Sequence, residues 1–261
     1  MFAAPVAPPA PTSVTWSAQT VRNSAATQPV TPVTDPAPMP APVTTLPPFG
    51  PDVSVWKGSV NWPLVVSPQI RDGQPGRTVS FAFTKATERT WVDPTLATNW
   101  RGMASVGLIR GAYDFAAFSR NPRLDARFYV ATMNSVGGFR AKGDFAVLDS
   151  EGPTMMRKTK VIRWITAWTR EVHRLTGLPN SRIVIYTGGW WWGPHTGNST
   201  VFARAGHPLW LSGYRTKPSL PGWQTSWWQY TDRAKFPGIK GGTDASVWLG
   251  TEQSLRRLAG Y

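Results

Sequence analysis

Eight short apolar runs recur through the chain, and each ends near a polar side chain. Runs of this length, bounded by glycine, proline or polar residues, are typical of β-strands. This recurrence predicts a fold built around eight strands. The runs cover residues 51–56, 78–87, 105–115, 144–151, 182–188, 208–214, 225–231 and 243–249.

The segments between the earlier runs are long enough to hold helices. The clearest candidate spans residues 154–175, where apolar residues recur at spacings of four and three and so form one stripe. Gly177 predicts its end, because glycine commonly follows the last turn of a helix. Two further helices are expected over residues 94–105 and 122–135. After residue 188 the gaps are shorter and rich in glycine, proline and tryptophan, so full helices hardly fit there.

Strands that alternate with helices favour a parallel sheet, and eight of them favour closure into a barrel. The chain is therefore predicted to have an α/β fold, an irregular TIM-like (β/α)5(β)3 barrel over residues 50–261. Residues 1–49 hold 12 of the 25 prolines and only two charged side chains, Arg22 and Asp35. That composition is typical of a disordered, proline-rich arm or linker.

Several classes of protein are not expected from the composition. No run of 18 apolar residues exists, so no membrane-spanning helix is predicted. The start, MFAAPVAPPAPT, lacks a basic region, and its prolines interrupt any apolar stretch, so a secretory signal peptide is not expected. The chain has no cysteine, its three histidines have no ligand-like spacing, and no glycine-rich phosphate loop follows a strand. We therefore expect neither a metal site nor a cofactor.

The charge of the chain predicts a polyanionic partner. Lysine and arginine outnumber acidic residues 28 to 14, which gives a net charge of +14. Nucleic acid and an anionic cell wall both qualify as partners. The basic residues are scattered and match no nucleic-acid recognition motif, which favours the cell wall. The 15 tryptophans agree with this, because sugar rings stack on flat aromatic faces.

The run GDFAVLDSEG, residues 143–152, ends on two acids one residue apart, Asp149 and Glu151. Residues i and i+2 of a strand face the same side, so both carboxyl groups would meet at the carboxyl end of a barrel strand. Two neighbouring acids cannot ionise equally easily, and one stays protonated toward neutral pH. A proton donor beside an anionic stabiliser is what cleavage of a glycosidic bond requires. A solvated strand end, or a salt bridge to an arginine, is the alternative.

Eight stretches occur in a fixed order: GPDVSVW, FTKATE, GAYDFA, LDSEG, IYTGGWWW, PLWLSGY, WWQYTD and TDASVWLG. Together they resemble glycoside hydrolase family 25, the muramidases typical of fungal, bacterial and phage lysozymes. The resemblance runs from about Gly50 to Gly250, so it covers essentially the whole predicted domain. It implies an irregular barrel of eight strands.

The resemblance also implies roles for individual residues. Glu151 would be the general acid, and Asp149 would support a positively charged transition state. Asp52, from the first strand, and Asp244, from the last, would line the same bowl. The positions that typically shape the sugar groove match Tyr113, Tyr186, Trp210, Tyr214, Trp228 and Gln229.

Three positions depart from the family pattern. Asp114 stands where the family usually has histidine, and we expect it to be a fifth acid near the site, in the substrate-binding set. Arg89 replaces the usual glycine, and the asparagine two residues after Asp244 is missing. Lys85 and Glu88 form either a surface pair or part of the groove. The tryptophans at 190–192 form either a stacking platform, which we favour, or a packed loop.

The resemblance thus implies a β-1,4-N-acetylmuramidase that acts on bacterial peptidoglycan. We also expect it to bind anionic cell-wall polymers, to act as a monomer, and to bind no nucleic acid. With no signal peptide, the enzyme would be made in the cytoplasm and released to the wall, as phage endolysins are. A non-catalytic glycan-binding protein on the same barrel is the alternative from another class. A chitinase-like hydrolase is the nearest enzymatic alternative, but its D-x-x-D-x-D-x-E run is absent.

Overall fold

The computed structural model describes residues 46–71, 74–214 and 216–261. Most of the predicted proline-rich arm lies outside these residues. The first strand begins at Phe49, whose ring is buried and stacks on Phe236 with the ring centroids 5.8 Å apart. No helix in the described parts of the chain is long and apolar enough to cross a membrane.

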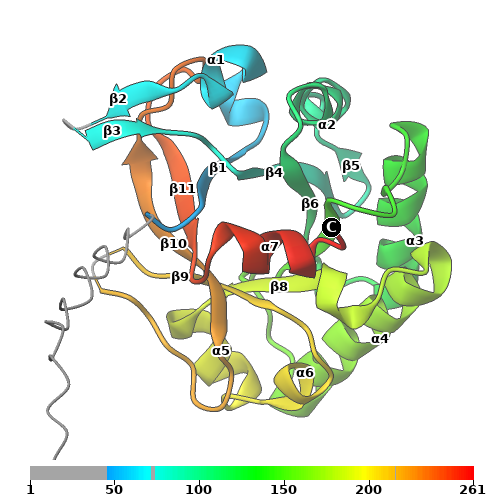
Figure 1. Cartoon of the computed structure of the whole chain (residues 1–261). Helices are drawn as coiled ribbons and strands as arrows, with labels where there is room; N and C mark the ends of the chain where they lie inside the picture. Colours follow the sequence, from blue (N-terminus) through cyan, green and yellow to red (C-terminus); the bar gives the residue numbers. More distant parts are fainter. Residues whose placement is uncertain (1–45, 72–73, 215) are drawn as a thin grey trace, which may run out of the picture. The chain divides into compact units, whose positions relative to one another are not determined.

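Eight strands close into a barrel, as the sequence predicts (Figure 1). Each of the eight apolar runs overlaps one of these strands, and five of the runs contain theirs completely. Around the ring their order is β1, β11, β10, β9, β8, β7, β6 and β4, and a pairing between β1 and β4 closes it. Their bounds are Phe49–Val53 (β1), Phe81–Glu88 (β4), Ile109–Phe115 (β6), Asp144–Asp149 (β7), Ile183–Gly188 (β8), Leu209–Ser212 (β9), Thr225–Ala234 (β10) and Thr243–Trp248 (β11).

The sheet is not parallel throughout, and in this respect the prediction is wrong. β11 runs antiparallel to both of its neighbours, β1 and β10. Residues 235–242 connect β10 to β11, and this segment is too short for the crossover of a dozen or more residues that parallel strands require. The chain therefore turns back after β10, and β11 pairs with β10 in the opposite direction. Its consequence is that the start of β11 lies at the same end of the barrel as the ends of the other strands.

The three predicted helices are present on the outside of the barrel. α2 spans Leu96–Ser105, α3 spans Pro122–Ser135 and α4 spans Lys158–Thr176. α4 begins four residues after its predicted start. It ends at Gly177, whose φ of 70° is left-handed and whose N–H donates to the carbonyl of His173. Figure 1 shows α3 and α4 side by side along one flank of the barrel.

Shorter elements complete the fold. The sequence did not predict the short helices or the small hairpins, because a single turn of helix leaves little periodicity to detect. After residue 188 only short helices occur in the described chain, in keeping with the short gaps there. These elements are α1 (Trp62–Val66), α5 (Gly189–Thr196), α6 (Val201–Arg204), α7 (Glu252–Leu258), the hairpin of β2 (Gln69–Arg71) and β3 (Gln74–Arg77), and β5 (Trp91–Val92), which pairs with β4.

Aromatic side chains fill the barrel interior, so the barrel is a packed core and not a pore. Phe83 stacks on Trp210 with the ring centroids 4.3 Å apart, and Trp227 meets the ring of Phe145 edge-on. Leu255 of α7 belongs to the same cluster, so α7 covers one end of the barrel (Figure 1). Polar side chains inside the barrel lie at its opposite end, where the parallel strands end.

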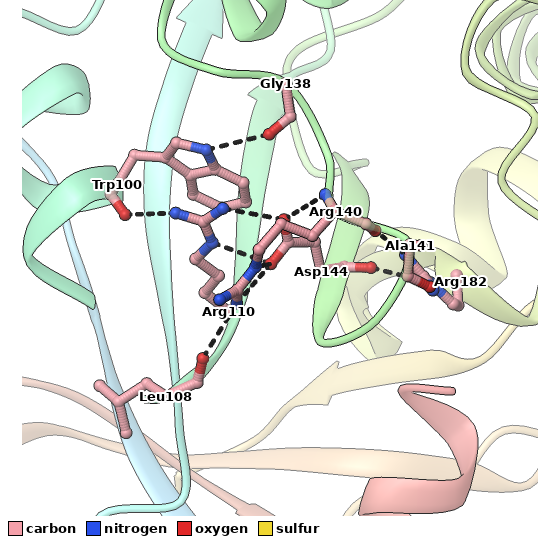
Figure 2. A network of polar contacts seen from close by, with 8 residues as sticks. All are labelled: Trp100, Leu108, Arg110, Gly138, Arg140, Ala141, Asp144 and Arg182. Atoms are coloured by element: carbon pink, nitrogen blue, oxygen red, sulfur yellow. Dashed lines mark hydrogen bonds and ion pairs between the residues drawn. The ribbon is translucent and has the colours of Figure 1, made fainter. Parts of the chain in front are cut away.

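A charged network lies at the amino ends of the strands (Figure 2). The carboxylate of Asp144, the first residue of β7, is fully buried and accepts hydrogen bonds from Arg110 at 2.8 and 2.9 Å. Arg140 donates to the same carboxylate through its backbone and its guanidinium. Arg182 donates to the backbone carbonyl of Asp144. This network ties four segments together at the end remote from the polar interior positions.

Candidate active site

A small cavity of about 160 Å³ opens at the carboxyl end of the barrel. Nine of the eleven site residues named from the sequence line it, and four of the nine are acidic. No group of three or more histidine, aspartate or glutamate side chains in the described chain is arranged to hold a metal ion. The lining residues are Asp52, Tyr113, Asp149, Glu151, Tyr186, Trp210, Tyr214, Gln229 and Asp244.

Strand geometry explains why residues distant in sequence meet here. Asp149 is the last residue of β7 and lies opposite Tyr186 in the register with β8. Asp52 lies directly opposite Asp244, because β1 and β11 pair antiparallel with these residues in register. Glu151 follows β7 by two residues and points to the same cavity as Asp149. The predicted same-side arrangement of the acid pair is therefore present.

Gln229 joins the two halves of the cavity through hydrogen bonds. Its Nε2 donates to Asp52 Oδ2 at 3.1 Å, and its Oε1 accepts from the hydroxyl of Tyr186 at 2.9 Å. The hydroxyl of Tyr214 donates to the same oxygen at 3.5 Å. Since the amide is held from both ends, the orientations of Asp52 and Tyr186 are fixed relative to each other.

Asp149 is the deepest member of the acid pair. It is 7% exposed, and its Oδ1 accepts no hydrogen bond from any described residue. Burial raises its pKa well above the usual value, and the charge of Glu151 raises it further. The ammonium group of Lys85 opposes this shift. A buried carboxylate oxygen without a donor is costly to maintain, which is typical of a group that meets a ligand.

Glu151 is more accessible than Asp149, so it is better placed to reach a ligand. Burial raises the pKa of Glu151 above its ordinary 4.5, whereas a hydrogen bond with Tyr186 lowers it. The charge of Asp244 raises the pKa of Glu151 again. The arrangement therefore favours the protonated form of Glu151 at higher pH than in a free glutamate.

Asp52 and Asp244, the acid pair across the cavity, also have raised pKa values. Burial raises the pKa of Asp52 well above normal, with Asp244 as the next cause. Burial also raises the pKa of Asp244, and Lys57 opposes both shifts. Lys57 lies in the short helix Val55–Lys57 after β1, and its ammonium group donates to the carbonyl of Gly242 at 2.5 Å. Lys57 was not identified from the sequence, because it belongs to no motif.

Asp114 and Trp228, two of the residues expected in the groove, do not line the cavity. Asp114 is buried on the helix side of β6, where it accepts hydrogen bonds from Thr87 at 2.6 Å and from the indole of Trp168 at 2.9 Å. The indole of Trp228 donates to the carbonyl of Gly213 at 2.7 Å. Adjacent strand residues face opposite sides. Since Tyr113 and Gln229 point inward, their neighbours point outward.

The remaining alternatives from the sequence also have structural answers. Lys85 forms an ion pair with Glu88 at 2.6 Å. It also lies close enough to Asp149 to lower the pKa of that acid, so both alternatives for Lys85 hold. Trp191 and Trp192 are buried packing residues, whereas Trp190 is 66% exposed. Two of the three tryptophans therefore pack on the barrel and form no stacking platform, although all three belong to α5 and not to a loop.

Arg89 explains why glycine is common at its position in the family. It has a φ of 57°, in the left-handed region that favours glycine. It lies in the turn between β4 and β5, beside Lys85 and Glu88 in sequence. An arginine at this position therefore costs local backbone strain of the order of 1–2 kcal/mol.

A closed α/β barrel with clustered carboxyl groups and aromatic walls at the carboxyl ends of its strands is typical of glycoside hydrolases. The family model "Glycosyl hydrolases family 25" matches residues 51–239. The chain therefore belongs to glycosyl hydrolase family 25, and it is a glycoside hydrolase.

The chain is also similar to individual proteins. The chain is 33% identical over 210 residues to "Uncharacterized protein YegX" of Escherichia coli O157:H7, covering 79% of this chain and 71% of that protein. It is 31% identical over 218 residues to "Lysozyme M1" of Streptomyces globisporus, covering 80% and 70%. Among solved structures, the bacterial lysozyme from Streptomyces coelicolor superposes with a TM-score of 0.71 at 29% identity, covering 82% of this chain and 98% of that one.

Proposed function

We propose that this glycoside hydrolase is a lysozyme, a β-1,4-N-acetylmuramidase that cleaves peptidoglycan between N-acetylmuramic acid and N-acetylglucosamine. The names of its relatives support the substrate: one is "Lysozyme M1", and another, from Chalaropsis sp, is "N,O-diacetylmuramidase" at 26% identity. The observation that carries the proposal is the pair Asp149 and Glu151 in the aromatic-walled cavity of a family 25 barrel.

In this proposal Glu151 is the general acid. Its raised pKa keeps a proton on the carboxyl group at higher pH than in a free glutamate. The proton passes to the glycosidic oxygen as the bond between that oxygen and the anomeric carbon breaks, and the leaving sugar departs with a free hydroxyl. Positive charge then develops on the remaining ring. Asp149 lies deeper in the cavity, where burial raises its pKa. The ammonium group of Lys85 and the positive charge that develops on the ring both favour its anionic form, which then compensates that charge.

Two routes complete the reaction. Either water attacks the anomeric carbon directly, or the acetamido oxygen of the substrate attacks first and water opens the intermediate. Asp52 and Asp244 lie on the opposite wall of the cavity from β7, where either carboxylate can orient the attacking group. The anomeric configuration of the freshly released sugar distinguishes the routes, because direct attack inverts it and acetamido assistance retains it.

Glu151→Gln tests the assignment of the acid. The two side chains have nearly the same shape, so the variant should fold, and loss of proton donation alone should lower turnover by roughly 10²–10⁴-fold. Purified peptidoglycan is digested and new reducing ends are identified by mass spectrometry. Glu252→Gln, an exposed change on α7, is the matched control and should keep full activity.

Turnover within tenfold of wild type by Glu151→Gln would assign the acid to another group. A wild-type protein that sediments with walls but releases no new reducing ends would instead support the non-catalytic glycan-binding alternative. Monomeric state and a role as a phage endolysin stay predictions from the sequence. Sedimentation equilibrium tests the first of them.

A further inference from the structure

The acidic and basic side chains of this protein are segregated. Seven of the twelve acidic residues that the structure describes are buried, and Glu151 and Asp244 line the active-site cavity. Of the described basic residues, only Arg110 and Arg182 are buried. Because most of the acids are turned inward, the surface is more positive than the net charge of +14 alone implies.

Five of the arginines line one groove on the outside of the barrel. The groove has a volume of about 460 Å³ and lies between α3 and α4, which pack side by side (Figure 1). Five arginines and one glutamate line it, with two small residues from α4 between them. The lining residues are Arg123, Arg127, Arg163, Thr166, Ala167, Arg170, Glu171 and Arg174.

The arginines form a row along the helix axes. Arg163, Arg170 and Arg174 are spaced seven and four residues apart and so share one face of α4. Since a helix rises 1.5 Å per residue, this row is about 16 Å long. Such a row matches an anion that repeats along a chain better than it matches a single small ion.

Only part of the groove's charge is neutralised internally. Glu171 pairs with Arg127 and Arg174 at 2.7 Å each, and hydrogen bonds from Arg174 and Arg127 lower the pKa of Glu171 to about 2. Arg163 and Arg170 are exposed and form no ion pair with any described residue. The guanidinium group presents a planar set of donors that fits phosphate oxygens two at a time.

We propose that the groove between α3 and α4 binds a phosphodiester polymer of the bacterial wall, and that it holds the enzyme on its insoluble substrate. The choice of polymer rests on the proposed muramidase function. Single-stranded nucleic acid is disfavoured because no aromatic side chain lines the groove for its bases to stack on, and binding to a DNA duplex is one outcome of the test. The groove is on the outer face of the helices and the cavity is inside the barrel, so both can be occupied at once.

The test is a double charge reversal, Arg163→Glu with Arg170→Glu. Both residues are exposed and have no ion-pair partner among the described residues, so the change should leave the fold intact. The matched control reverses Arg101 and Arg257, which are exposed on α2 and α7, and so carries the same net charge. Affinity for purified intact walls is measured by sedimentation over a range of salt concentrations, and hydrolysis of a soluble glycan fragment is measured in parallel.

The groove variant should bind intact walls at least about tenfold more weakly than the control, with a shallower dependence on salt because fewer counterions are released. Walls stripped of phosphodiester polymers with hydrofluoric acid should bind the wild type only as strongly as they bind the groove variant. Both variants should cleave the soluble fragment at the wild-type rate, since neither change touches the cavity.

Three outcomes would overturn the proposal: equal losses in the two double variants, no loss in the groove variant, or wild-type affinity that survives stripping of the walls. Loss of binding to a DNA duplex without any loss on walls would assign the groove to nucleic acid instead. If the wild type fails to cleave the soluble fragment, the muramidase proposal fails, while the difference in wall binding still supports the groove.

Discussion

Replacing Asp144 by asparagine should destabilise the barrel without altering its chemistry. The carboxylate is fully buried, and its two oxygens accept five hydrogen bonds from Arg110 and Arg140, four of them from the cationic guanidinium groups (Figure 2). Asparagine keeps the shape but leaves the buried guanidinium of Arg110 without a counter-charge. Its Nδ2 would also face donors where an acceptor is needed.

The size of the effect follows from this geometry. Breaking a buried ion pair by removing one partner costs about 3–5 kcal/mol. For a domain of this size each kcal/mol lowers the melting temperature by about 2–4 °C, so we expect a decrease of about 6–20 °C. Arg110 also packs over the ring of Trp100, 3.6 Å from its centroid, and that contact should persist. Since domains are typically stable by about 5–15 kcal/mol, we expect the variant to remain largely folded at 25 °C.

Differential scanning calorimetry of wild type and Asp144→Asn measures this difference. The control is Glu252→Gln, which breaks an exposed pair with Arg256 and should cost no more than about 1 kcal/mol. Turnover of a soluble glycan at 25 °C should be unchanged in Asp144→Asn, because the network lies at the opposite end of the barrel from the cavity. A decrease in melting temperature of less than about 2 °C would refute the argument that this charge is needed.

Three further predictions concern the cavity and the amino-terminal region. Burial raises the pKa of Asp52, so ionisation of this side chain opposes folding increasingly as the pH rises above the ordinary pKa of 3.8. Asp52→Asn should therefore raise the melting temperature more at pH 7 than at pH 4. The exposed change Asp232→Asn should not show this difference between the two pH values. Tyr186→Phe removes a hydrogen bond that lowers the pKa of Glu151, so the alkaline limb of the pH–rate profile should move to higher pH; an unchanged limb would contradict the role of Glu151. A chain beginning at Pro47 keeps the strand that starts at Phe49 and should melt within about 5 °C of the full chain and cleave soluble glycan equally fast, because the removed residues offer few large apolar groups.

Much of the barrel could be predicted from the sequence because its signals are local. Strand runs and the apolar stripe of α4 depend on periodicities of two and 3.6 residues, which any short window of sequence contains. The placement of Asp149 and Glu151 on one side at the end of β7 follows from the same rule. That rule also contained a signal that was missed: because adjacent strand residues face opposite sides, Tyr113 and Asp114 cannot both line one cavity.

Other features depend on segments that come together only in the folded chain. Gln229 holds Asp52 across a separation of 177 residues, and no local pattern predicts that contact. The reversal that makes β11 antiparallel places Asp244 beside Asp52, although connection length gave a partial indication.

The sequence by itself determined the alternation of strands and helices, the family and the identity of the acids, because these depend on residue type and spacing along the chain. Only the tertiary structure decided how those acids behave. Burial is the largest cause of the raised pKa values of Asp52, Asp149, Glu151 and Asp244, and burial depends on the whole closed barrel. The groove between α3 and α4 also depends on the tertiary structure. Its arginines belong to two helices, and they form one surface only because α3 packs against α4.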